Sequence, residues 1–320
     1  MCLWLPLLVA LGLIFLYRWY RQSLMLENLT GKYVFITGCD TGFGNLLAKK
    51  LDKQGLKILA ACLTEEGAGD LKNETSSRLQ TVILDVTDSQ SVKAAAKWTA
   101  DIVGNAGLWG LVNNAGFGIG FGPNLWQTKE DFAKMLNVNL LGTVDVTLNL
   151  VSLVIKARGR IVNVSSAVGR LAMMGGGYCP SKYGVQAFSD SLRRELRDFG
   201  IKVSIIEPGG FRTFINDADA QTKNLQRLWK KLSPDIKESF GEEYFKQYCQ
   251  SLGSMLGTVN PKLHLVPDCM EHALMALHPW TRYSPGWDCK LLYLPMSYLP
   301  TFIADYLLCC QSPKPALKLD

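Results

Sequence analysis

The stretch KYVFITGCDTGFG, residues 32–44, decides the fold of this chain, because an apolar run passes there through a glycine-rich turn into a helical sequence. Gly38, Gly42 and Gly44 permit a tight turn and a close approach of another backbone or of a ligand. The helix that follows would offer free N–H groups and a partial positive charge to a pyrophosphate. The spacing G-x-x-x-G-x-G differs from the G-x-G-x-x-G of other dinucleotide-binding folds. The segment predicts a strand, a phosphate-binding turn and a helix.

Short apolar runs alternate with longer helical segments up to about residue 210. Nearly continuous apolar runs are typical of strands covered on both faces, and their alternation with helices indicates βαβ units. The sequence therefore predicts an α/β fold with a single Rossmann-type, doubly wound parallel sheet and helices on both faces. The predicted strands are residues 32–37, 57–61, 79–84, 108–114, 159–164 and 202–207, and the helices between them begin near Gly44, Ser89, Thr128 and Tyr178.

The composition argues against several classes of protein. Of 320 residues, 48% are hydrophobic and 19% are charged, which suits a packed core and not a disordered chain. The net charge of +6 is spread along the chain, so no nucleic-acid partner is expected. Nine scattered cysteines without a C-x-x-C pair argue against a disulfide framework or a structural zinc site. Cys269 and His272 could share a helix face, but with only three histidines we expect no metal.

An uncharged apolar stretch, residues 1–17, opens the chain, and Arg18 and Arg21 follow it together with two aromatic residues. This length nearly suffices to span a bilayer, and Trp and Tyr favour its interface. A cleaved signal peptide is the alternative, but no basic segment precedes the stretch and no small-x-small site follows it. We therefore expect residues 1–22 to be a retained membrane anchor.

A second apolar segment covers residues 288–310. Pro295 and Pro300 make it a poor spanning helix. It could lie on the bilayer surface or cover the mouth of a substrate site. A C-terminal extension that packs on the core fits equally well, so both interpretations stay open.

Further motifs occur in order and in register with the predicted strands. They are Asn113-Asn114-Ala115-Gly116 at the end of the fourth strand, Asn139 in the next helix, Ser165 and Ser166 after the fifth strand, and Tyr178-x-x-x-Lys182 at the start of the following helix. With the glycine turn, they resemble the short-chain dehydrogenase/reductase family over roughly residues 30–215. The sequences TGCDTGFG, LAACLTEEGA, GLWGLVNNAG, GGGYCPSKYGV and HPWTRYSPGWD resemble its membrane-bound retinol and hydroxysteroid dehydrogenase branch. The resemblance implies an NAD(P)-dependent alcohol dehydrogenase.

Tyr178 and Lys182 are four residues apart, so they project from one helix face. A phenol with a pKa near 10 is a poor base at neutral pH, and a nearby ammonium favours its ionised form. Tyr178 is thus the predicted proton acceptor from a substrate alcohol. The resemblance implies that Lys182 also hydrogen-bonds the nicotinamide ribose, and that Asn139 holds a water that links Lys182 to solvent. A helical Asn is otherwise usually exposed or a cap.

One hydroxyl of Ser165 and Ser166 should hold and polarise the substrate oxygen. Counting back from Tyr178 by the commonest family spacing selects Ser165, whereas aligning the strand ends selects Ser166. We prefer Ser166, because a loop length varies more readily than a strand register. Ser166 and Tyr178 are therefore the predicted substrate contacts.

Charge favours NAD over NADP as the cofactor. The second strand ends in Cys62 and Leu63, where many NAD-dependent family members have Asp and many NADP-dependent members have Arg or Lys. Asp40 in the turn would repel a 2′-phosphate, and Glu65 and Glu66 follow soon after. The residues expected to contact the cofactor, largely from the resemblance, are Gly38, Asp40, Thr41, Gly42, Phe43, Gly44, Cys62, Asp85, Asn114, Ala115, Gly116, Tyr178, Lys182 and Thr213.

Two of these assignments rest on the resemblance alone. Asp85 resembles the family residue that contacts adenine, although it could instead cap the helix that begins near Ser89. Thr213 ends the sequence PGGFRT, which resembles the loop under the nicotinamide, and it is expected to contact the carboxamide.

The predicted substrate is a lipophilic small molecule. Residues 211–260 are too long for an ordinary connection, so they are a predicted lid within a domain of residues 30–320. The branch resemblance implies retinol oxidised to retinal, or a 3α- or 17β-hydroxysteroid oxidised to a ketosteroid. The apolar and aromatic residues of the lid suit such a substrate but could equally be packing residues; they are Leu228, Trp229, Phe240, Tyr244, Phe245 and Tyr248.

Two other functions compete with this one: an NADPH-dependent carbonyl reductase on similar substrates, and a nucleotide-binding membrane scaffold without turnover. The same residues serve oxidation and reduction, so the sequence does not fix the direction. The presence of Tyr178, Lys182, Asn139 and both serines argues against the scaffold.

The resemblance implies the endoplasmic reticulum (microsomal) membrane and a possible homodimer. Arg18 and Arg21 follow the apolar stretch, so the positive-inside rule places the body on the cytoplasmic face. Members of the resembled branch are often described as lumenal, but we prefer the cytoplasmic face. Asn28, Asn73 and Asn163 each begin an N-x-[ST] sequon, and Asn73, in a polar stretch, is the useful reporter.

Overall fold

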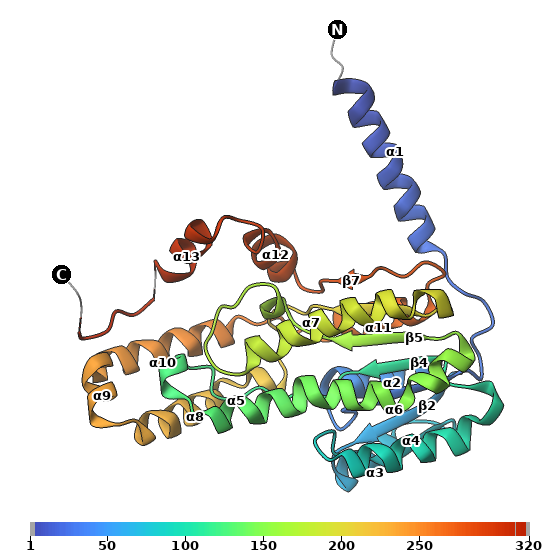
Figure 1. Cartoon of the computed structure of the whole chain (residues 1–320), viewed down its shortest axis with the longest axis horizontal. Helices are drawn as coiled ribbons and strands as arrows, with labels where there is room; N and C mark the ends of the chain where they lie inside the picture. The colour runs from blue at the N-terminus through green and yellow to red at the C-terminus, as the bar shows by residue number, and fades with distance from the viewer. Residues whose placement is uncertain (1–3, 311, 318–320) are drawn as a thin grey trace.

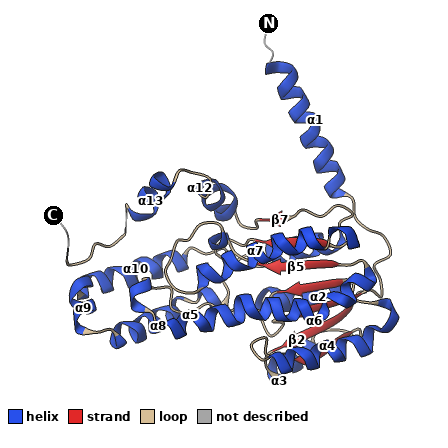
Figure 2. Cartoon of the chain, in the orientation of Figure 1, coloured by secondary structure: helices blue, strands red, loops and turns tan. Residues whose placement is uncertain are grey.

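Seven parallel strands form a single sheet in the computed structural model, which describes residues 4–310 and 312–317 (Figures 1 and 2). The strand order is β3-β2-β1-β4-β5-β6-β7. The predicted α/β fold is therefore confirmed, whereas β7 was not predicted, because two residues are too few to make a pattern. The strands are β1 (Tyr33–Thr37), β2 (Lys57–Cys62), β3 (Leu79–Ile83), β4 (Gly110–Asn113), β5 (Arg160–Val164), β6 (Lys202–Ile206) and β7 (Arg282–Tyr283).

Helices cover both faces of the sheet, which explains why its strands are apolar without alternation. Val34 and Ile36 of β1 pack in one hydrophobic cluster, and Phe35 between them packs in the cluster on the other face. The helices α2 (Gly42–Lys53), α3 (Glu65–Asn73) and α11 (Leu265–Met275) cover the first face, and α4 (Ser89–Val103), α6 (Gly142–Ala157) and α7 (Tyr178–Glu195) cover the second.

The strand order reverses between β1 and β4. β2 and β3 lie on one side of β1, and β4 to β7 follow on the other side. The connections after β1 and β4 therefore leave in opposite directions, and a crevice opens at the carboxyl ends of these two strands. Figure 1 shows the strand arrows pointing toward this end of the sheet, where α5 (Lys129–Leu136) and α8 (Ala218–Lys231) lie.

Three helices, α8, α9 (Pro234–Phe240) and α10 (Glu242–Gly257), form the segment that the sequence marks as a lid. Trp126, from the loop before α5, packs at their centre; the Trp229 ring is 5.2 Å from its ring and stacks at 4.9 Å on that of Phe245. The apolar and aromatic residues of the lid were expected either to contact the substrate or to pack on one another. The structure shows packing, because these side chains bury one another. They are Leu228, Trp229, Phe240, Tyr244, Phe245 and Tyr248.

α5 continues through a π-helical turn, Asn137–Leu141, into α6. Among the described residues, this stretch, Lys129–Ala157, is the one continuous helix with the length and hydropathy of a membrane span. Val146, Leu150 and Val154 of α6 pack against the sheet, so its apolar character reflects a core position.

Both apolar ends of the chain lie apart from the sheet. α1 (Trp4–Ser23) projects from the body, and α12 (Leu294–Met296) and α13 (Thr301–Cys309) form a separate ridge (Figure 1). Of the predicted anchor and dehydrogenase domain, residues 1–3, 311 and 318–320 lie outside the described residues.

Candidate functional site

The glycine turn after β1 brings the N-terminus of α2 to the crevice. Thr41 is the N-cap, but its side chain makes no capping hydrogen bond, so it leaves the first N–H groups of α2 without the usual side-chain acceptor. A Cβ atom at Gly44 would lie 2.4 Å from the Gly38 carbonyl oxygen, so only glycine lets the turn sit against the helix. This geometry fits the pyrophosphate of a dinucleotide.

Thr37 and Asn114 join the ends of β1 and β4 at the crevice. Thr37 Oγ1 accepts hydrogen bonds from the N–H groups of Asn114, at 3.0 Å, and Ala115, at 2.9 Å. The Asn114 amide donates to the carbonyls of Thr37, at 2.9 Å, and Gly38, at 3.0 Å. Asn114 thus fixes the floor of the crevice from both sides.

A cavity of about 1490 Å³ extends from this turn along the carboxyl ends of the strands. Its size suits a dinucleotide together with a small-molecule substrate. Of the predicted site residues, those that line it are Gly38, Asp40, Thr41, Gly42, Phe43, Asp85, Asn114, Ala115, Gly116, Ser165, Ser166, Tyr178, Lys182 and Thr213.

Cys62, Gly44 and Asn139 do not line the cavity. The assignment of Cys62 as a cofactor contact is therefore wrong: it is fully buried in the core cluster of β2, and burial raises the pKa of its thiol to about 12. Leu63, the first residue after β2, lines the cavity with 60% of its surface exposed, because it lies beyond the end of the strand, where the helices no longer cover the chain. Gly44 acts through the backbone approach that it allows.

Asp40 holds the turn after β2. Its carboxylate accepts hydrogen bonds from the N–H groups of Leu63, at 2.8 Å, and Thr64, at 2.9 Å, and from the Thr64 hydroxyl, at 2.8 Å. Gly67 in α3 permits this contact, since a Cβ atom there would lie 2.7 Å from Asp40 Oδ1. The N–H groups at this end of the cavity are thus already bound to a negative charge.

Ser166 and Ser165 point in different directions. Ser166 lines the cavity within hydrogen-bonding reach of the Tyr178 phenol, and its hydroxyl also donates to the Pro208 carbonyl at 3.4 Å. Ser165 also borders the cavity, but it is buried and its hydroxyl is already engaged, donating to the backbone carbonyl of Lys182 at 2.9 Å. The geometry therefore favours Ser166 over Ser165 as a substrate contact.

Burial opposes ionisation of Tyr178. The protein around it raises the pKa of the phenol above its usual value, the neighbouring Cys179 adds to this shift, and the hydrogen bond with Ser166 lowers the pKa. Lys182 Nζ lies 5.7 Å from the centre of the Tyr178 ring, and the expectation that it lowers this pKa stays a prediction. Lys182 Nζ instead donates to the Val164 carbonyl at 3.0 Å, and burial lowers the pKa of its ammonium to about 8.

Asn139 lies in the π-helical turn and is buried. Its Oδ1 accepts from Phe117 N–H at 2.7 Å, and its Nδ2 donates to the Phe117 carbonyl at 2.8 Å and to Ser181 Oγ at 3.0 Å. The interpretation of an exposed or capping Asn is therefore wrong. Asn139 fixes the loop after β4 against the helix that carries Tyr178 and Lys182.

Asp85 and Thr213 lie at opposite parts of the cavity wall. Asp85 Oδ1 accepts from Thr87 N–H at 2.8 Å, whereas Asp88 is the N-cap of α4, so the capping alternative for Asp85 is wrong. Thr213 follows the Pro208–Phe211 loop beside Ser166.

No cluster of three potential metal ligands occurs among the described residues. His272, one of the two residues considered for a metal, uses both ring nitrogens elsewhere. They lie 2.8 Å from the Tyr283 hydroxyl and 2.8 Å from the Gln22 carbonyl.

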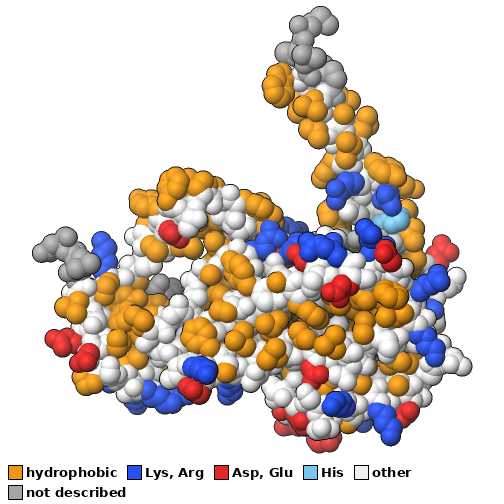
Figure 3. Space-filling model, in the orientation of Figure 1, with side chains coloured by type: hydrophobic (Ala, Val, Ile, Leu, Met, Phe, Trp, Pro, Cys, Tyr) orange, Lys and Arg blue, Asp and Glu red, His pale blue; other side chains and the backbone are white. Residues whose placement is uncertain are grey.

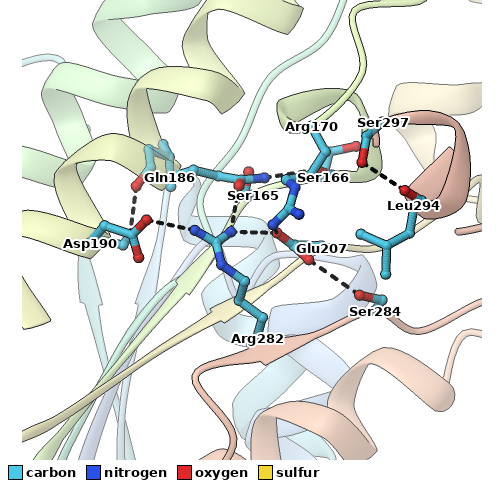
Figure 4. A network of polar contacts seen from close by, with 12 residues as sticks. Ser165, Ser166, Arg170, Gln186, Asp190, Glu207, Arg282, Ser284, Leu294 and Ser297 are labelled. Atoms are coloured by element: carbon cyan, nitrogen blue, oxygen red, sulfur yellow. Dashed lines mark hydrogen bonds and ion pairs between the residues drawn. The ribbon is translucent and has the colours of Figure 1, made fainter. Parts of the chain in front are cut away.

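An ion network that the sequence analysis missed lies beneath the serines (Figure 4). Glu207, at the end of β6, is 1% exposed and accepts from Arg282 of β7 at 2.6 Å and from Ser284 at 3.2 Å. Arg282 also binds Asp190 of α7 at 2.7 Å, and Arg170 lies 3.6 Å from Glu207. Arg282 could have been suspected only from its place in the tail HPWTRYSPGWD.

Asp288, from the same tail, holds the loop that lines the cavity below Ser166. Its Oδ2 accepts from Gly210 N–H at 2.6 Å, whereas Oδ1 is buried without a hydrogen-bond partner among the described residues. A Cβ atom at Gly209 would lie 2.2 Å from the carboxylate, and one at Gly286 would lie 2.4 Å away. Two glycines thus make room for one carboxylate directly behind the cavity wall.

Comparison with known proteins agrees with this geometry. The short chain dehydrogenase family profile matches residues 32–224. Retinol dehydrogenase 7 of Rattus norvegicus is 55% identical over 99% of this chain and 100% of its own length, and retinol dehydrogenase 16 of Homo sapiens is 56% identical over 99% and 100%. The 17-beta-hydroxysteroid dehydrogenase type 6 of Mus musculus is 52% identical over 98% and 99%. The resemblance predicted from the motifs is confirmed.

Solved structures share the fold at low sequence identity. A short chain dehydrogenase/reductase from Burkholderia phymatum, in complex with NAD, has a TM-score of 0.68 at 21% identity and covers 92% of this chain and 100% of its own. A short chain dehydrogenase from Burkholderia cenocepacia, in complex with NADP, has a TM-score of 0.64 at 19% identity, covering 88% and 99%.

Replacing Asp288 should loosen the cavity wall selectively. We expect Asp288→Ala to weaken NADH binding about tenfold, because a charge-assisted hydrogen bond to the Gly210 loop is lost. Binding of ADP-ribose, which lacks the nicotinamide, should stay unchanged. Asp288→Asn keeps an acceptor and should restore most of the NADH affinity. Fluorescence titration and calorimetry measure both ligands, and an equal loss for the two would contradict a role confined to the loop.

Proposed function

On the premise that the chain belongs to the short chain dehydrogenase family, whose members are oxidoreductases with a nicotinamide cofactor, we propose a reaction. The protein interconverts lipophilic alcohols and carbonyls. The leading substrates are retinol, oxidised to retinal, and 3α- or 17β-hydroxysteroids, oxidised to ketosteroids. One observation carries the proposal: Tyr178, Ser166 and Lys182 meet in the cavity that begins at the phosphate-binding turn.

We assign the proton transfer to Tyr178. Its phenol is the titratable group beside Ser166, whose hydroxyl can donate to the substrate oxygen and hold it there. Lys182, four residues along α7, lies with its Nζ 5.7 Å from the Tyr178 ring. When bound, the oxidised nicotinamide supplies the hydride acceptor and a positive charge, and that charge would favour the phenolate that burial alone disfavours. Asn139 keeps this arrangement in place through the Phe117 loop.

The substrate class is supported by the wall of the cavity beyond Tyr178. Apolar side chains line that end, which suits a polyene or a steroid better than a polar metabolite. They include Ile215 and Leu256, which belong to the same hydrophobic cluster as Tyr178. The names of the similar retinol and 17-beta-hydroxysteroid dehydrogenases point to the same class.

We propose NAD as the cofactor rather than NADP. A 2′-phosphate at the end of β2 would meet the Asp40 carboxylate, and the N–H groups of Leu63 and Thr64 are already bound to it. The adenosine hydroxyls of NAD carry no such charge and can donate to Asp40.

We also propose that α1 anchors the enzyme in a membrane, with the body on the cytoplasmic face. The described helix has 20 residues, and those from Trp4 to Tyr17 form an uncharged, mostly apolar stretch. Its large apolar side chains are exposed, and Arg18 and Arg21 lie at the end nearest the body. The endoplasmic reticulum is the proposed compartment.

Tyr178→Phe should abolish most turnover. Loss of the phenolic oxygen removes the proton acceptor and costs about 10²- to 10⁴-fold in kcat. The assay is oxidation of a panel of retinoids and hydroxysteroids by detergent-solubilised protein, with NADH binding as the check that the variant is folded. Tyr183→Phe, on the same helix, is the matched control and should keep its activity. A Tyr178→Phe enzyme with more than about a tenth of the wild-type rate would contradict the assignment.

A double substitution should shift the cofactor preference. Asp40→Asn removes the charge but keeps an acceptor for the turn, and Leu63→Arg adds a fork-shaped phosphate donor on the cavity wall. We expect the ratio of kcat/KM for NADP to that for NAD to rise about 10-fold or more. Leu63→Arg alone, with the charge of Asp40 retained, should give a smaller rise. An unchanged ratio in the double variant would show that this turn does not select the cofactor.

The exposed Asn73 reports on membrane orientation. With a cytoplasmic body, protein synthesised in the presence of microsomes should carry no glycan, and protease added to intact vesicles should digest the body. A mass shift that endoglycosidase removes and that Asn73→Gln abolishes would establish a lumenal body instead.

A further inference from the structure

The buried face of α8 carries one side-chain amide, that of Gln221. The other buried residues of this helix, Leu225, Leu228 and Trp229, recur with Gln221 at the spacing of a single helix face. Charged side chains lie along the outer edge of the lid (Figure 3), so α8 turns its charged residues outward and Gln221 inward. Gln221 is only 1% exposed. A buried amide needs hydrogen-bond partners for both its oxygen and its nitrogen.

The Gln221 amide binds backbone groups of two separate loops. Its Oε1 accepts from Gly120 N–H at 2.9 Å and from Phe121 N–H at 3.5 Å. Its Nε2 donates to the Gly118 carbonyl at 3.0 Å and to the Ile215 carbonyl at 2.7 Å. The first three groups lie in the loop after β4, whereas Ile215 lies in the segment that leads from β6 into α8. One side chain thus joins both loops to the lid.

The loop after β4 depends on such side chains for its position. Its stretch FGIGF, residues 117–121, has no polar side chain of its own, so its buried backbone groups need partners from elsewhere. Asn139 binds both backbone groups of Phe117, and Gln221 binds the residues that follow. Tyr248 of α10 donates to the Phe121 carbonyl at 2.9 Å. The loop is therefore held by the π-helical turn at one end and by the lid at the other.

Both loops meet at the ring of Tyr178. The centre of the Phe121 ring lies 5.4 Å from that of the Tyr178 ring. A Cβ atom at Gly118 would lie 2.7 Å from Ile215 Cγ2 and 3.2 Å from atoms of the Phe121 and Tyr178 rings. Gly118 is therefore the point at which the two loops and the phenol ring come together. Because Ile215 also lines the cavity, a shift of the lid moves a wall of the site.

We propose that Gln221 is a positioning residue for the reaction, which holds the lid against the loop after β4 and so fixes the packing around the Tyr178 ring. This inference rests on the proposed function, in which Tyr178 accepts the proton. Gln221 is not among the residues that line the cavity, so it acts through the two loops. Without its amide, four backbone groups lose their partners and the interface loosens. The phenol then meets the substrate oxygen in a less uniform geometry, which slows the chemical step.

Gln221→Met tests this role, because methionine has a similar length but lacks the amide donor and oxygen. The full chain in detergent oxidises a retinoid or a hydroxysteroid, and kcat is expressed per NADH-binding site determined by titration. We expect this kcat to fall about tenfold, with the NADH affinity within about twofold of the wild-type value. Unfolded protein binds no NADH, so a merely structural role would leave kcat per site unchanged. Gln226→Met, at an exposed position of α8, is the matched control and should behave as the wild type.

Gln221→Glu gives a graded comparison. The introduced carboxyl keeps an acceptor for Gly120 and, when burial holds it protonated, offers one donor where the amide offers two. We therefore expect a smaller loss of kcat per site, about threefold. Hydrogen exchange measures the contact directly: the peptide that contains Gly120 and Phe121 should exchange faster in Gln221→Met, because the acceptor is gone, and at the wild-type rate in Gln226→Met.

The outcomes separate this inference from the proposed function. A wild-type kcat per site in Gln221→Met would overturn the inference and leave the function intact. Should that variant not fold, a wild-type kcat per site in Gln221→Glu would overturn it in the same way. The proposed function would fail by a different result, in which the wild-type protein binds NADH but oxidises no retinoid or hydroxysteroid.

Discussion

The contact between the ends of β1 and β4 is the constraint on which the site depends. Thr37 Oγ1 receives two backbone N–H groups from the β4 end, and the Asn114 amide returns two hydrogen bonds to the β1 end. Beyond the paired residues of β1 and β4, the connections leave in opposite directions, so this contact joins the two chain segments at the crevice. With the crevice held open at a fixed width, the uncapped end of α2 lies on one side and α7, with Tyr178 and Lys182, on the other.

Burial then decides the chemistry that this frame permits. Both ionisable groups of the candidate site are desolvated, so the phenol of Tyr178 is held protonated and the ammonium of Lys182 loses its proton more readily than in water. The desolvated site therefore holds the phenol and the ammonium close together, and an oxidised nicotinamide bound there would supply the hydride acceptor.

The last part of the chain completes the site from behind. β7 adds Arg282, which neutralises the buried Glu207 and joins it to Asp190 of α7, and Asp288 holds the Gly210 loop. A buried carboxylate without such partners would cost several kcal/mol. The same segment leads into α12 and α13, so the body is not a dehydrogenase core with an independent tail. The cavity wall and the ion network are one connected structure.

The sequence by itself determined the class of fold, the glycine turn and the spacing of Tyr178 and Lys182, because these depend on local periodicity and on backbone freedom. It also favoured Ser166 through strand register, and the structure binds the Ser165 hydroxyl to the Lys182 carbonyl, which leaves Ser166 as the serine within reach of Tyr178. Only the tertiary structure decided that Cys62 is buried, that the aromatic residues of α8 to α10 pack on one another, and that Arg282 and Asp288 lie under the site. Those outcomes depend on contacts between residues more than 70 positions apart in the sequence, such as the hydrogen bond between Gly210 and Asp288. A local sequence pattern does not predict contacts of this kind.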